Sequence, residues 1–343
     1  MKRLLNTLYV TTQGAYLARE SETVVVLVDG ETRFKVPIHT LGSVVCFGQV
    51  SCSPPLMEMC AKWHVSISFL SEYGKFWARV EGPVSGNVLL RREQYRRADN
   101  PVTSAKIAQS LVIAKIANCR TVLLRAARER PEDCAAPYLT QATNYLGQLI
   151  KRLDAPAPLE VVRGIEGDAA KNYFSVFNRL ITAQKEDFIF HERSRRPPLD
   201  NVNAIMSFMY TILAHDVTSA LETVGLDPAV GYLHRDRPGR PSMALDLMEE
   251  FRPYLADRLA LSLINRQQIK GAGFRKTGTG AVLMDDETRK EVLVNYQKRK
   301  QDEIQHPFLG EKVAIGLLPY VQAMLMARYL RGDLDGYPPF IWK

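Results

Sequence analysis

Residues 231–253 read GYLHRDRPGRPSMALDLMEEFRP and combine a histidine, a basic loop and an acidic helix. His234 ends a short apolar run, and a loop punctuated by Pro and Gly follows it at residues 235–241. Ser242 is suited to be a helix N-cap, because its hydroxyl can accept a hydrogen bond from an unpaired amide of the first turn. The stretch therefore predicts that a flexible loop leads from His234 into a helix.

The acidic residues of this predicted helix share one face, because Glu249 and Glu250 lie three and four positions after Asp246. Like charges at that spacing repel one another, so the pattern does not favour helix stability. A bound divalent cation would turn the repulsion into ligation. Since the loop can bring His234 over the carboxylates and its arginines to a phosphate backbone, the stretch indicates metal-assisted chemistry on nucleic acid.

A second carboxylate interrupts an apolar helix stripe. Positions 159, 162, 166, 169, 173, 176 and 180 are spaced by three and four, and all are apolar or aromatic except Glu166. Burying that carboxylate unpaired would cost several kcal/mol. Glu166 must therefore meet a cation, an Arg or Lys partner, or water in a cleft. A structural salt bridge and a metal-ligand role both remain open at this point.

The composition is that of a globular protein with an excess of positive charge. The 343 residues suffice for two or three domains, 46% of them are hydrophobic, and the net charge is +8. This charge favours polyanionic partners without requiring them. The N-terminus becomes polar too early for a signal peptide, and we expect no segment that crosses a membrane.

The cysteines indicate a reducing compartment. Five of them occur at irregular spacing, so we expect free thiols and a cytoplasmic location. Cys60 and His64 have a spacing that zinc ligands can adopt, but zinc motifs present two close ligand pairs. We therefore interpret the cysteines as small buried apolar residues.

The order of the predicted elements indicates an α+β multidomain fold. Short strands are expected at residues 4–11, 15–19, 23–28, 32–36, 43–47, 65–70 and 75–80, with one helix at 54–63. Many short antiparallel strands favour a small sandwich. Helices are expected at residues 103–128, 137–153, 158–180, 201–224, 285–301 and 310–331, with a hairpin joining 274–276 to 281–284 and an irregular tail. We accordingly divide the chain into a β-rich domain (1–82), a linker (83–101) and an all-α catalytic domain (102–343).

Basic side chains cluster near these motifs and are candidates for phosphate contacts that are independent of DNA sequence. Each one alone is more typical of a solvated surface. The candidates are Arg193, Arg195, Arg196, Arg235, Arg237, Arg240, Lys270, Arg275 and Lys276.

Three motifs in a fixed order carry a family resemblance. The first is RGIEGDAA at residues 163–170, followed by Tyr173 and Phe174. The second is PPLD at 197–200 with Asn203 and Ala204, followed by GLDP at 225–228, and the third is the stretch 231–253. Together they resemble the CRISPR-associated integrase/endonuclease family of spacer acquisition, Cas protein one. The wording of residues 234–253 is similar to the subtype I-C branch.

The resemblance implies a fold and a set of site residues. The fold would be an N-terminal β-sandwich joined to an all-α catalytic domain, and the protein would be a homodimer through its N-terminal domain. The metal triad of the family falls on Glu166, His234 and Glu249. Many relatives have Asp where Glu249 stands, and Asp246 lies three residues earlier, so the roles of these two carboxylates stay open. We take Glu249 as the ligand and Asp246 as its support or an occasional ligand.

The resemblance also implies a reaction. Two carboxylates and one imidazole suit Mg²⁺ or Mn²⁺, and the 3′-OH of a captured double-stranded DNA fragment would attack the boundary of a CRISPR repeat. The implied partners are a bridging dimer of Cas protein two and the Cas protein four nuclease that trims ends. The alternatives are a stand-alone metal-dependent nuclease and a non-catalytic DNA-binding scaffold.

Overall fold

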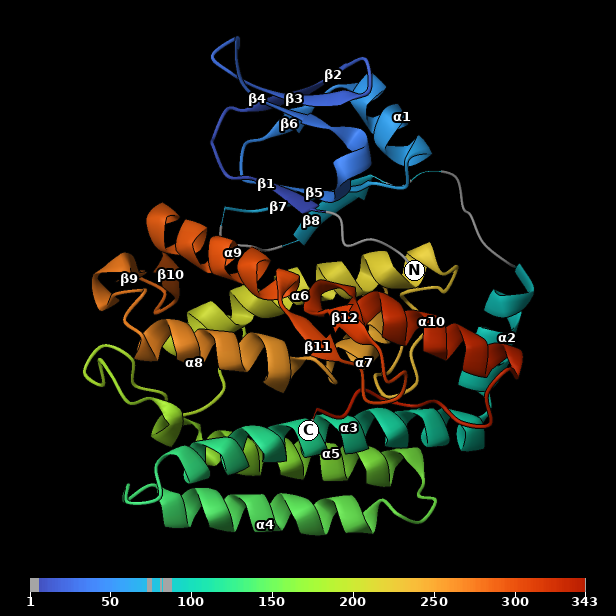
Figure 1. Cartoon of the computed structure of the whole chain (residues 1–343), viewed down its shortest axis with the longest axis vertical. Helices are drawn as coiled ribbons and strands as arrows, with labels where there is room; N and C mark the ends of the chain where they lie inside the picture. Colours follow the sequence, from blue (N-terminus) through green and yellow to red (C-terminus); the bar gives the residue numbers. More distant parts are fainter. Residues whose placement is uncertain (1–5, 73–75, 81, 83–87, 343) are drawn as a thin grey trace. The chain divides into compact units, whose positions relative to one another are not determined.

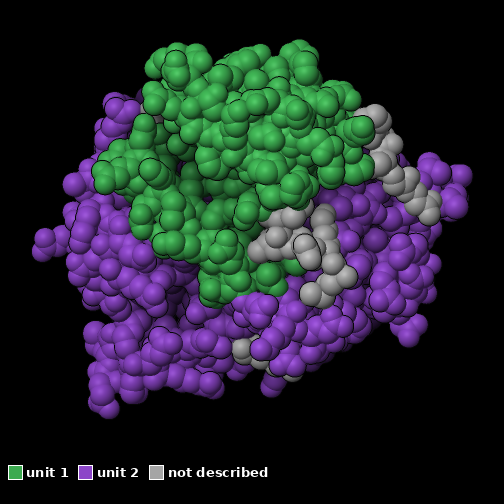
Figure 2. Space-filling view, turned by 45° about the horizontal axis from the view of Figure 1, so that its top comes forward, with its two compact units in different colours: residues 1–85, 284–302, 314–317 green, residues 86–283, 303–313, 318–343 purple. Residues whose placement is uncertain are grey.

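The structure is a computed structural model, and it describes residues 6–72, 76–80, 82 and 88–342. Its contacts form two compact units, coloured separately in Figure 2: residues 1–85, 284–302 and 314–317, and residues 86–283, 303–313 and 318–343. These units are not continuous in sequence, unlike the division at residues 83–101 proposed above. The reason is that α9 (Asp286–Gln301) contacts β1 (Asn6–Val10) of the first unit, where Gln297 donates a 3.4 Å hydrogen bond to the Thr7 carbonyl.

The first unit contains two four-stranded sheets (Figure 1). One has the order β1-β5-β7-β8, with β5 at Leu41–Phe47, β7 at Ser66–Leu70 and β8 at Phe76–Val80. The other has the order β4-β3-β2-β6, with β4 at Glu31–Pro37, β3 at Thr23–Val28, β2 at Tyr16–Glu20 and β6 at Ser51–Cys52. Buried residues of both sheets and of α1 (Pro54–Lys62) form one apolar cluster. The predicted β-sandwich is therefore confirmed.

The expected antiparallel pairing is wrong for the centre of the first sheet, where β5 runs parallel to both β1 and β7. The chain between β5 and β7 passes through β6 and α1, a crossover of the kind that parallel strands require. The sequence of β5 is consistent with this, because five of its residues in succession are buried rather than alternating.

Three of the five cysteines are buried, as predicted, whereas Cys52 is half-buried and Cys134 is exposed. Cys46 and Cys60 are buried in the cluster of the first unit, and burial raises the pKa of each thiol to about 12. All five cysteines are free, whereas His64 is exposed to solvent. The alternative of a zinc pair therefore gains no support.

The second unit is helical. It contains a 3-10 turn η2 (Phe177–Leu180), a π-helical turn η3 (Arg252–Asp257) and the helices α2 (Val88–Asp99), α3 (Pro101–Glu129), α4 (Ala136–Arg152), α5 (Leu159–Ser175), α6 (Asn201–Thr223), α7 (Ser242–Met248), α8 (Arg258–Asn265) and α10 (Leu318–Arg331). In Figure 1, α3, α4 and α5 run side by side, and contacts between all three pairs agree. The predicted hairpin is present as β9 (Phe274–Lys276) and β10 (Val282–Met284).

Several predicted boundaries are wrong. Residues 83–87 of the expected linker lie outside the described residues, and 88–99 form α2, which buries Leu90 and Gln94. The single helix expected at 310–331 is replaced by β12 (Lys312–Ala314), which pairs with β11 (Glu303–Gln305), then η5 (Ile315–Leu317) and α10. Residues 332–342 contain no helix or strand, as expected.

Helices α3 and α6 are long and apolar enough, by length and composition alone, to cross a membrane, although the sequence led us to expect no such segment. In the structure 61% of the apolar window of α3 and 67% of that of α6 are buried. Both are therefore accounted for as core helices of the second unit.

Candidate active site

Asp246 on α7 holds the backbone and the ring of His234. Its carboxylate is fully buried and accepts hydrogen bonds from the amides of Tyr232 (2.6 Å), Leu233 (2.8 Å) and His234 (3.0 Å). The same carboxylate lies 2.6 Å from Nδ1 of the His234 ring. With Nδ1 engaged in this way, Nε2 is the nitrogen that remains for a ligand.

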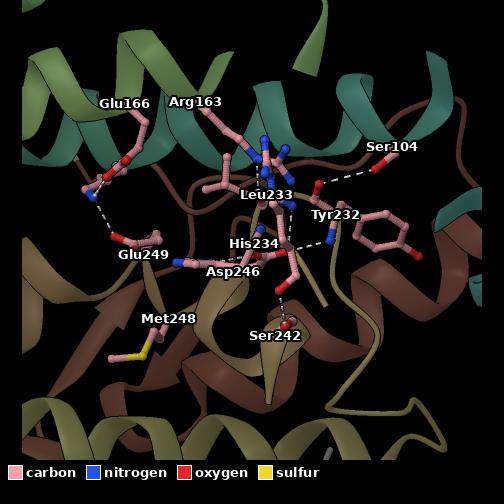
Figure 3. A network of polar contacts seen from close by, with 12 residues as sticks. Ser104, Arg163, Glu166, Tyr232, Leu233, His234, Ser242, Asp246, Met248 and Glu249 are labelled. Carbon is pink, nitrogen blue, oxygen red and sulfur yellow. Dashed lines mark hydrogen bonds and ion pairs between the residues drawn. The ribbon is translucent and has the colours of Figure 1, made fainter. Parts of the chain in front are cut away.

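The loop before His234 is fixed from two further helices. Ser104 on α3 donates a 3.2 Å hydrogen bond to the Tyr232 carbonyl, and Arg163 on α5 donates a 2.6 Å bond to the Leu233 carbonyl (Figure 3). Gly231 lies so close to α7 that a Cβ there would come within 2.7 Å of the Asp246 carboxylate. A glycine is required because the backbone must approach Asp246 closely.

Glu166 and Glu249 meet at one buried lysine. Figure 3 shows the two carboxylates directed toward one another, and both form ion pairs with Lys115 of α3. Nζ of Lys115 lies 2.8 Å from Oε2 of Glu249, yet this oxygen accepts no hydrogen bond of good geometry. The side chains of Lys115 and Glu249 are 9% and 2% exposed, whereas that of Glu166 is 26% exposed. The requirement that Glu166 meet a cation is therefore satisfied by Lys115.

The electrostatics of this cluster keep Glu249 ionised. Burial alone would raise the pKa of Glu249, but Arg252, Lys115 and His234 together lower it to about 2. Burial likewise opposes the charged form of Lys115, and Glu249 and Glu166 outweigh it and raise the pKa of the lysine. The effect of His234 on Glu249 indicates that the imidazole and this carboxylate belong to the same cluster.

Arg252, in the π-helical turn after Glu249, extends the cluster inward. Its guanidinium forms a 2.6 Å ion pair with Oε1 of Glu249 and lies 4.8 Å from the ring centroid of Tyr210. Tyr210 in turn donates a 2.6 Å hydrogen bond to Asp257, whose pKa burial raises to about 6. Turns of π-helix occur often at functional sites, and this one places Arg252 against Glu249.

Two details of the predicted acidic helix are wrong. Ser242 is the first helical residue rather than the N-cap, and its hydroxyl donates a 3.3 Å hydrogen bond to the Arg235 carbonyl. Helix α7 ends at Met248, so Glu249 and Glu250 do not continue the face that carries Asp246. The three acids instead contact three different sets of partners, which removes the repulsion expected between them.

The donor chemistry of the cluster fits a divalent cation. It offers two carboxylates, one with an oxygen that lacks a hydrogen bond, and an imidazole oriented by a buried aspartate. Among the described residues, no three His, Cys, Asp or Glu side chains lie close enough together to hold a metal as they stand. Lys115 instead provides the positive charge between Glu166 and Glu249.

The predicted DNA-contacting residues divide into exposed and internal ones. Arg195, Arg196, Arg235, Arg237, Lys270, Arg275 and Lys276 are exposed, and Arg240 is half-buried. The pKa of Arg240 is lowered by burial and then by nearby positive charge, first that of Arg237 and then that of Arg195 and Arg196. Arginines from two loops that are about 40 residues apart in sequence thus gather at one place.

Arg193 differs from the other candidates, because its side chain bonds to residues of α6 instead of lying on the surface. Its guanidinium donates hydrogen bonds to Asn203 (2.6 Å) and Ser207 (3.0 Å) and lies 5.2 Å from the ring centroid of Tyr210. Asn203 is itself held by Asp200, which caps α6 by accepting a 2.7 Å bond from the Asn203 amide. Arg193, Asp200 and Asn203 therefore form an internal support, which contrasts with the surface role proposed for Arg193.

Lys115 is the residue of the cluster that the sequence reasoning missed. Positions 105, 108, 112, 115, 119 and 122 are spaced by three and four, and Lys115 is the charged exception in an otherwise apolar stripe. All six residues are buried. A charged residue within an apolar stripe is the same signal that pointed to Glu166. Arg252 lies in no such stripe and gave no signal in the sequence.

Comparison with known proteins identifies the family. Residues 8–298 match the family model described as CRISPR associated protein Cas1. The chain belongs to this Cas1 family. It is 55% identical over 343 residues to the CRISPR-associated endonuclease Cas1 1 of Chlorobaculum tepidum, with both chains fully covered.

Two further Cas1-related proteins resemble the chain. It is 35% identical to a Cas4 exonuclease/Cas1 endonuclease fusion of Geobacter sulfurreducens, a match that covers 98% of this chain and 60% of the fusion. A solved Cas6-RT-Cas1–Cas2 complex contains a chain of the same fold, with a TM-score of 0.83 and 23% identity, covering 100% of this chain and 36% of that one. The α+β architecture described above is therefore that of the Cas1 fold.

Proposed function

We propose that the protein is a DNA integrase and endonuclease of spacer acquisition, which inserts captured double-stranded fragments into a CRISPR array by attack of a fragment 3′-OH on a repeat-boundary phosphodiester. Full-length identity of 55% to a protein named CRISPR-associated endonuclease Cas1 supports the reaction class. The cluster formed by Glu166, Glu249 and the His234–Asp246 pair carries the proposal at the level of residues.

The proposed metal ligands are Glu166, Glu249 and Nε2 of His234. A bound Mg²⁺ or Mn²⁺ would polarise the scissile phosphate and favour the deprotonated form of the attacking hydroxyl. Asp246 is the positioning residue, because both of its oxygens are occupied by amides of residues 232–234 and by the imidazole. The two carboxylates whose roles the sequence left open thus take different roles in the proposal.

The remaining parts of the proposal concern DNA, partners and location. Arg195, Arg196, Arg237 and Arg240 would contact the phosphate backbone, whereas Arg193 would act by supporting α6. Homodimerisation and bridging by Cas protein two follow from the family resemblance, and the Cas4 fusion of Geobacter sulfurreducens favours a Cas4-type nuclease as a further partner. The free thiols are in keeping with a cytoplasmic location, and we place the chain in the subtype I-C branch.

The first test replaces one proposed ligand. We expect Glu166→Ala to reduce strand transfer at least a hundredfold, while DNA affinity changes less than about threefold, because the carboxylate acts on the reaction and not on duplex binding. Glu129→Ala is the control, since Glu129 is an exposed carboxylate at the end of α3. Equal loss of transfer and of DNA binding in folded Glu166→Ala would favour the scaffold alternative.

A second assay separates integrase from nuclease. The protein is incubated with Cas protein two, a double-stranded fragment and a repeat-bearing plasmid. We expect branched joints at the repeat boundary, because a 3′-OH and water compete as nucleophiles at the same site. Hydrolysis products alone would identify the protein as a stand-alone nuclease.

A further inference from the structure

The last described residues of the chain are irregular in conformation but deeply buried. Tyr337 and Trp342 are each 6% exposed, and Phe340 is fully buried. We call residues 337–342 the C-terminal segment. In Figure 1 the chain after α10 returns to α3, and the hydrogen bonds described below agree with this course.

The C-terminal segment is bound to α3 through Asn118. The Asn118 side chain donates a 2.9 Å hydrogen bond to the Phe340 carbonyl and accepts a 2.8 Å bond from the Trp342 amide. A second proton of the same amide group is donated to the Glu250 carbonyl, at 2.7 Å. Asn118 therefore joins α3, the C-terminal segment and the turn after α7, and it lies one helical turn beyond Lys115.

The segment is also bound to the side chain of Glu250. Tyr337 donates a 2.6 Å hydrogen bond to Oε1, and the Phe340 amide donates a 2.7 Å bond to Oε2. Gln322 of α10 donates a further 2.9 Å bond to Oε2. The ring of Phe340 packs on Phe251, with centroids 5.8 Å apart. The segment thus contacts both residues that follow Glu249.

Glu249 needs support of this kind because no continuous helix carries it. Helix α7 ends at Met248 and the π-helical turn begins at Arg252. In between, the amides of Glu249, Glu250 and Phe251 donate to carbonyls three residues earlier, at 3.0–3.4 Å. Such short-range bonds are weaker in geometry than those of an α-helix. The position of the Glu249 carboxylate relative to Lys115 therefore depends on contacts from outside the turn.

We propose that the C-terminal segment is a positioning element of the active site: through Glu250 and Asn118 it fixes the turn that carries Glu249 against the helix that carries Lys115. Tyr337 and Phe340 are its positioning residues. The inference rests on the proposed function, in which Glu249 is a metal ligand. Groups that hydrogen-bond directly to a metal ligand change metal affinity by about 10–100-fold when they are mutated. The segment holds the residues that follow Glu249 rather than Glu249 itself, so we expect an effect at the lower end of that range.

The test uses two variants of the full chain. Tyr337→Phe removes one hydroxyl, and a stop codon after Pro339 removes the Phe340 and Trp342 anchors. We expect Mn²⁺ affinity, measured by titration with Mn²⁺ alone, to fall about tenfold in Tyr337→Phe and further in the truncated chain. We also expect amide hydrogen exchange at residues 249–251 to accelerate at least tenfold in both, with DNA affinity changed less than twofold.

Two control variants separate positioning from general stability. Leu146→Ala creates a cavity where α4 packs into the core of the second unit. It destabilises this unit without changing a residue that contacts the C-terminal segment. Asp335→Asn alters an exposed residue just before the segment. We expect both controls to keep the Mn²⁺ affinity and the exchange at residues 249–251 of the unmodified protein under conditions in which all variants are folded.

The outcomes distinguish this inference from the proposed function. Unchanged exchange at residues 249–251 in Tyr337→Phe overturns the inference whatever the metal does. If Glu166→Ala abolishes Mn²⁺ binding but Tyr337→Phe leaves it intact, the segment is only structural and the metal site stands. If Glu166→Ala leaves Mn²⁺ binding intact, the proposed metal site fails, and the inference fails with it.

Discussion

At the scale of single residues, the candidate site is organised by buried charges that neutralise one another. Lys115 faces Glu166 and Glu249, and Arg252 pairs with Glu249 from the other side. Removing one member of such a group leaves an uncompensated charge and is far more costly than replacing the whole group. The alternation of positive and negative side chains, rather than any single residue, therefore holds Glu166 and Glu249 near each other.

Lys115→Met tests this neutralisation. We expect the variant to lose about 3 kcal/mol of unfolding free energy in chemical denaturation, because Glu166 and Glu249 then face each other without their shared cation. Added Mn²⁺ should restore more stability to Lys115→Met than to the unmodified protein, since an ion then replaces the missing charge. Lys106→Met, at an exposed position of the same helix, should change stability by less than about 0.5 kcal/mol. A Mn²⁺ effect of equal size in both proteins would contradict the prediction.

Glu250 makes stability depend on pH. Burial raises the pKa of its carboxyl from 4.5 to about 8, against hydrogen bonds from Tyr337, Phe340 and Gln322 that lower it. The folded protein therefore retains a proton between pH 4.5 and 8 that the unfolded chain releases, and the stability that this proton contributes is lost as the pH rises through that window.

Glu250→Gln removes the titrating group and supplies the comparison. The unfolding free energy of the unmodified protein minus that of the variant should fall between about pH 5.5 and about pH 7.5, by up to about 1.4 kcal/mol per pH unit. Urea denaturation at several pH values measures this difference. A difference that stays constant with pH would show that Glu250 is ionised throughout.

At the scale of elements, the support for the site comes from loop-to-helix junctions. Asp200 caps α6 and also accepts a 2.6 Å hydrogen bond from the Asn203 side chain, which in turn holds Arg193. Arg193 and Arg252 lie 5.2 Å and 4.8 Å from the centroid of the same Tyr210 ring. The start of α6 is therefore connected through one aromatic ring to the arginine that pairs with Glu249.

Asp200→Ala tests this junction. We expect it to lower the unfolding free energy by about 1–2 kcal/mol, because the cap and the anchor of Asn203 are lost together. Asp227 serves as the control. It lies just beyond the C-terminal end of α6 and accepts a 2.6 Å hydrogen bond from the exposed Tyr95 of α2. Asp227→Ala should leave the near-ultraviolet signal of the Tyr210 environment unchanged, and Asp200→Ala should alter it. Identical spectra for the two variants would contradict the connection.

At the scale of the whole molecule, part of the positive charge gathers where four arginines of the second unit lie near one another. Arg195 and Arg196 belong to one loop and Arg237 and Arg240 to another. Burial lowers the pKa of Arg240, and the charges of the other three arginines lower it further. Arginines that repel one another this way are stabilised when a polyanion binds. Their convergence therefore favours a phosphate-binding surface over a scatter of solvated charges.

DNA binding should accordingly depend steeply on salt. We expect the double variant Arg196→Ala/Arg237→Ala to reduce the slope of log K against log salt by about 2, roughly one unit for each arginine that no longer neutralises a phosphate. Lys151→Ala, an exposed cation at the end of α4, should leave the slope unchanged. Fluorescence anisotropy with a labelled duplex between about 50 and 300 mM salt gives both slopes. Equal slopes for all three proteins would remove the arginines from the interface.

The sequence by itself determined the β-rich and helical parts of the chain, the bounds of most long helices and the candidate residues Glu166, His234 and Glu249. Periodicity predicts the helices, the strands and the exceptional position of Glu166, because burying one face of a helix or strand is a local property of the sequence. His234 and Glu249 were chosen from the motif at residues 231–253 and from the family resemblance that it carries. The charged exception in the stripe of α5 was visible for the same reason.

Only the tertiary structure decided which charges meet. Lys115 and Glu166 are 51 residues apart, and Asn118 and Phe340 are 222 apart. Such pairs depend on how helices pack, and local patterns do not record packing. Local patterns likewise do not record the parallel pairing of β5, the internal hydrogen bonds of Arg193 or the burial of the C-terminal segment. Each is settled by the need to satisfy buried polar groups across elements that are distant in the chain.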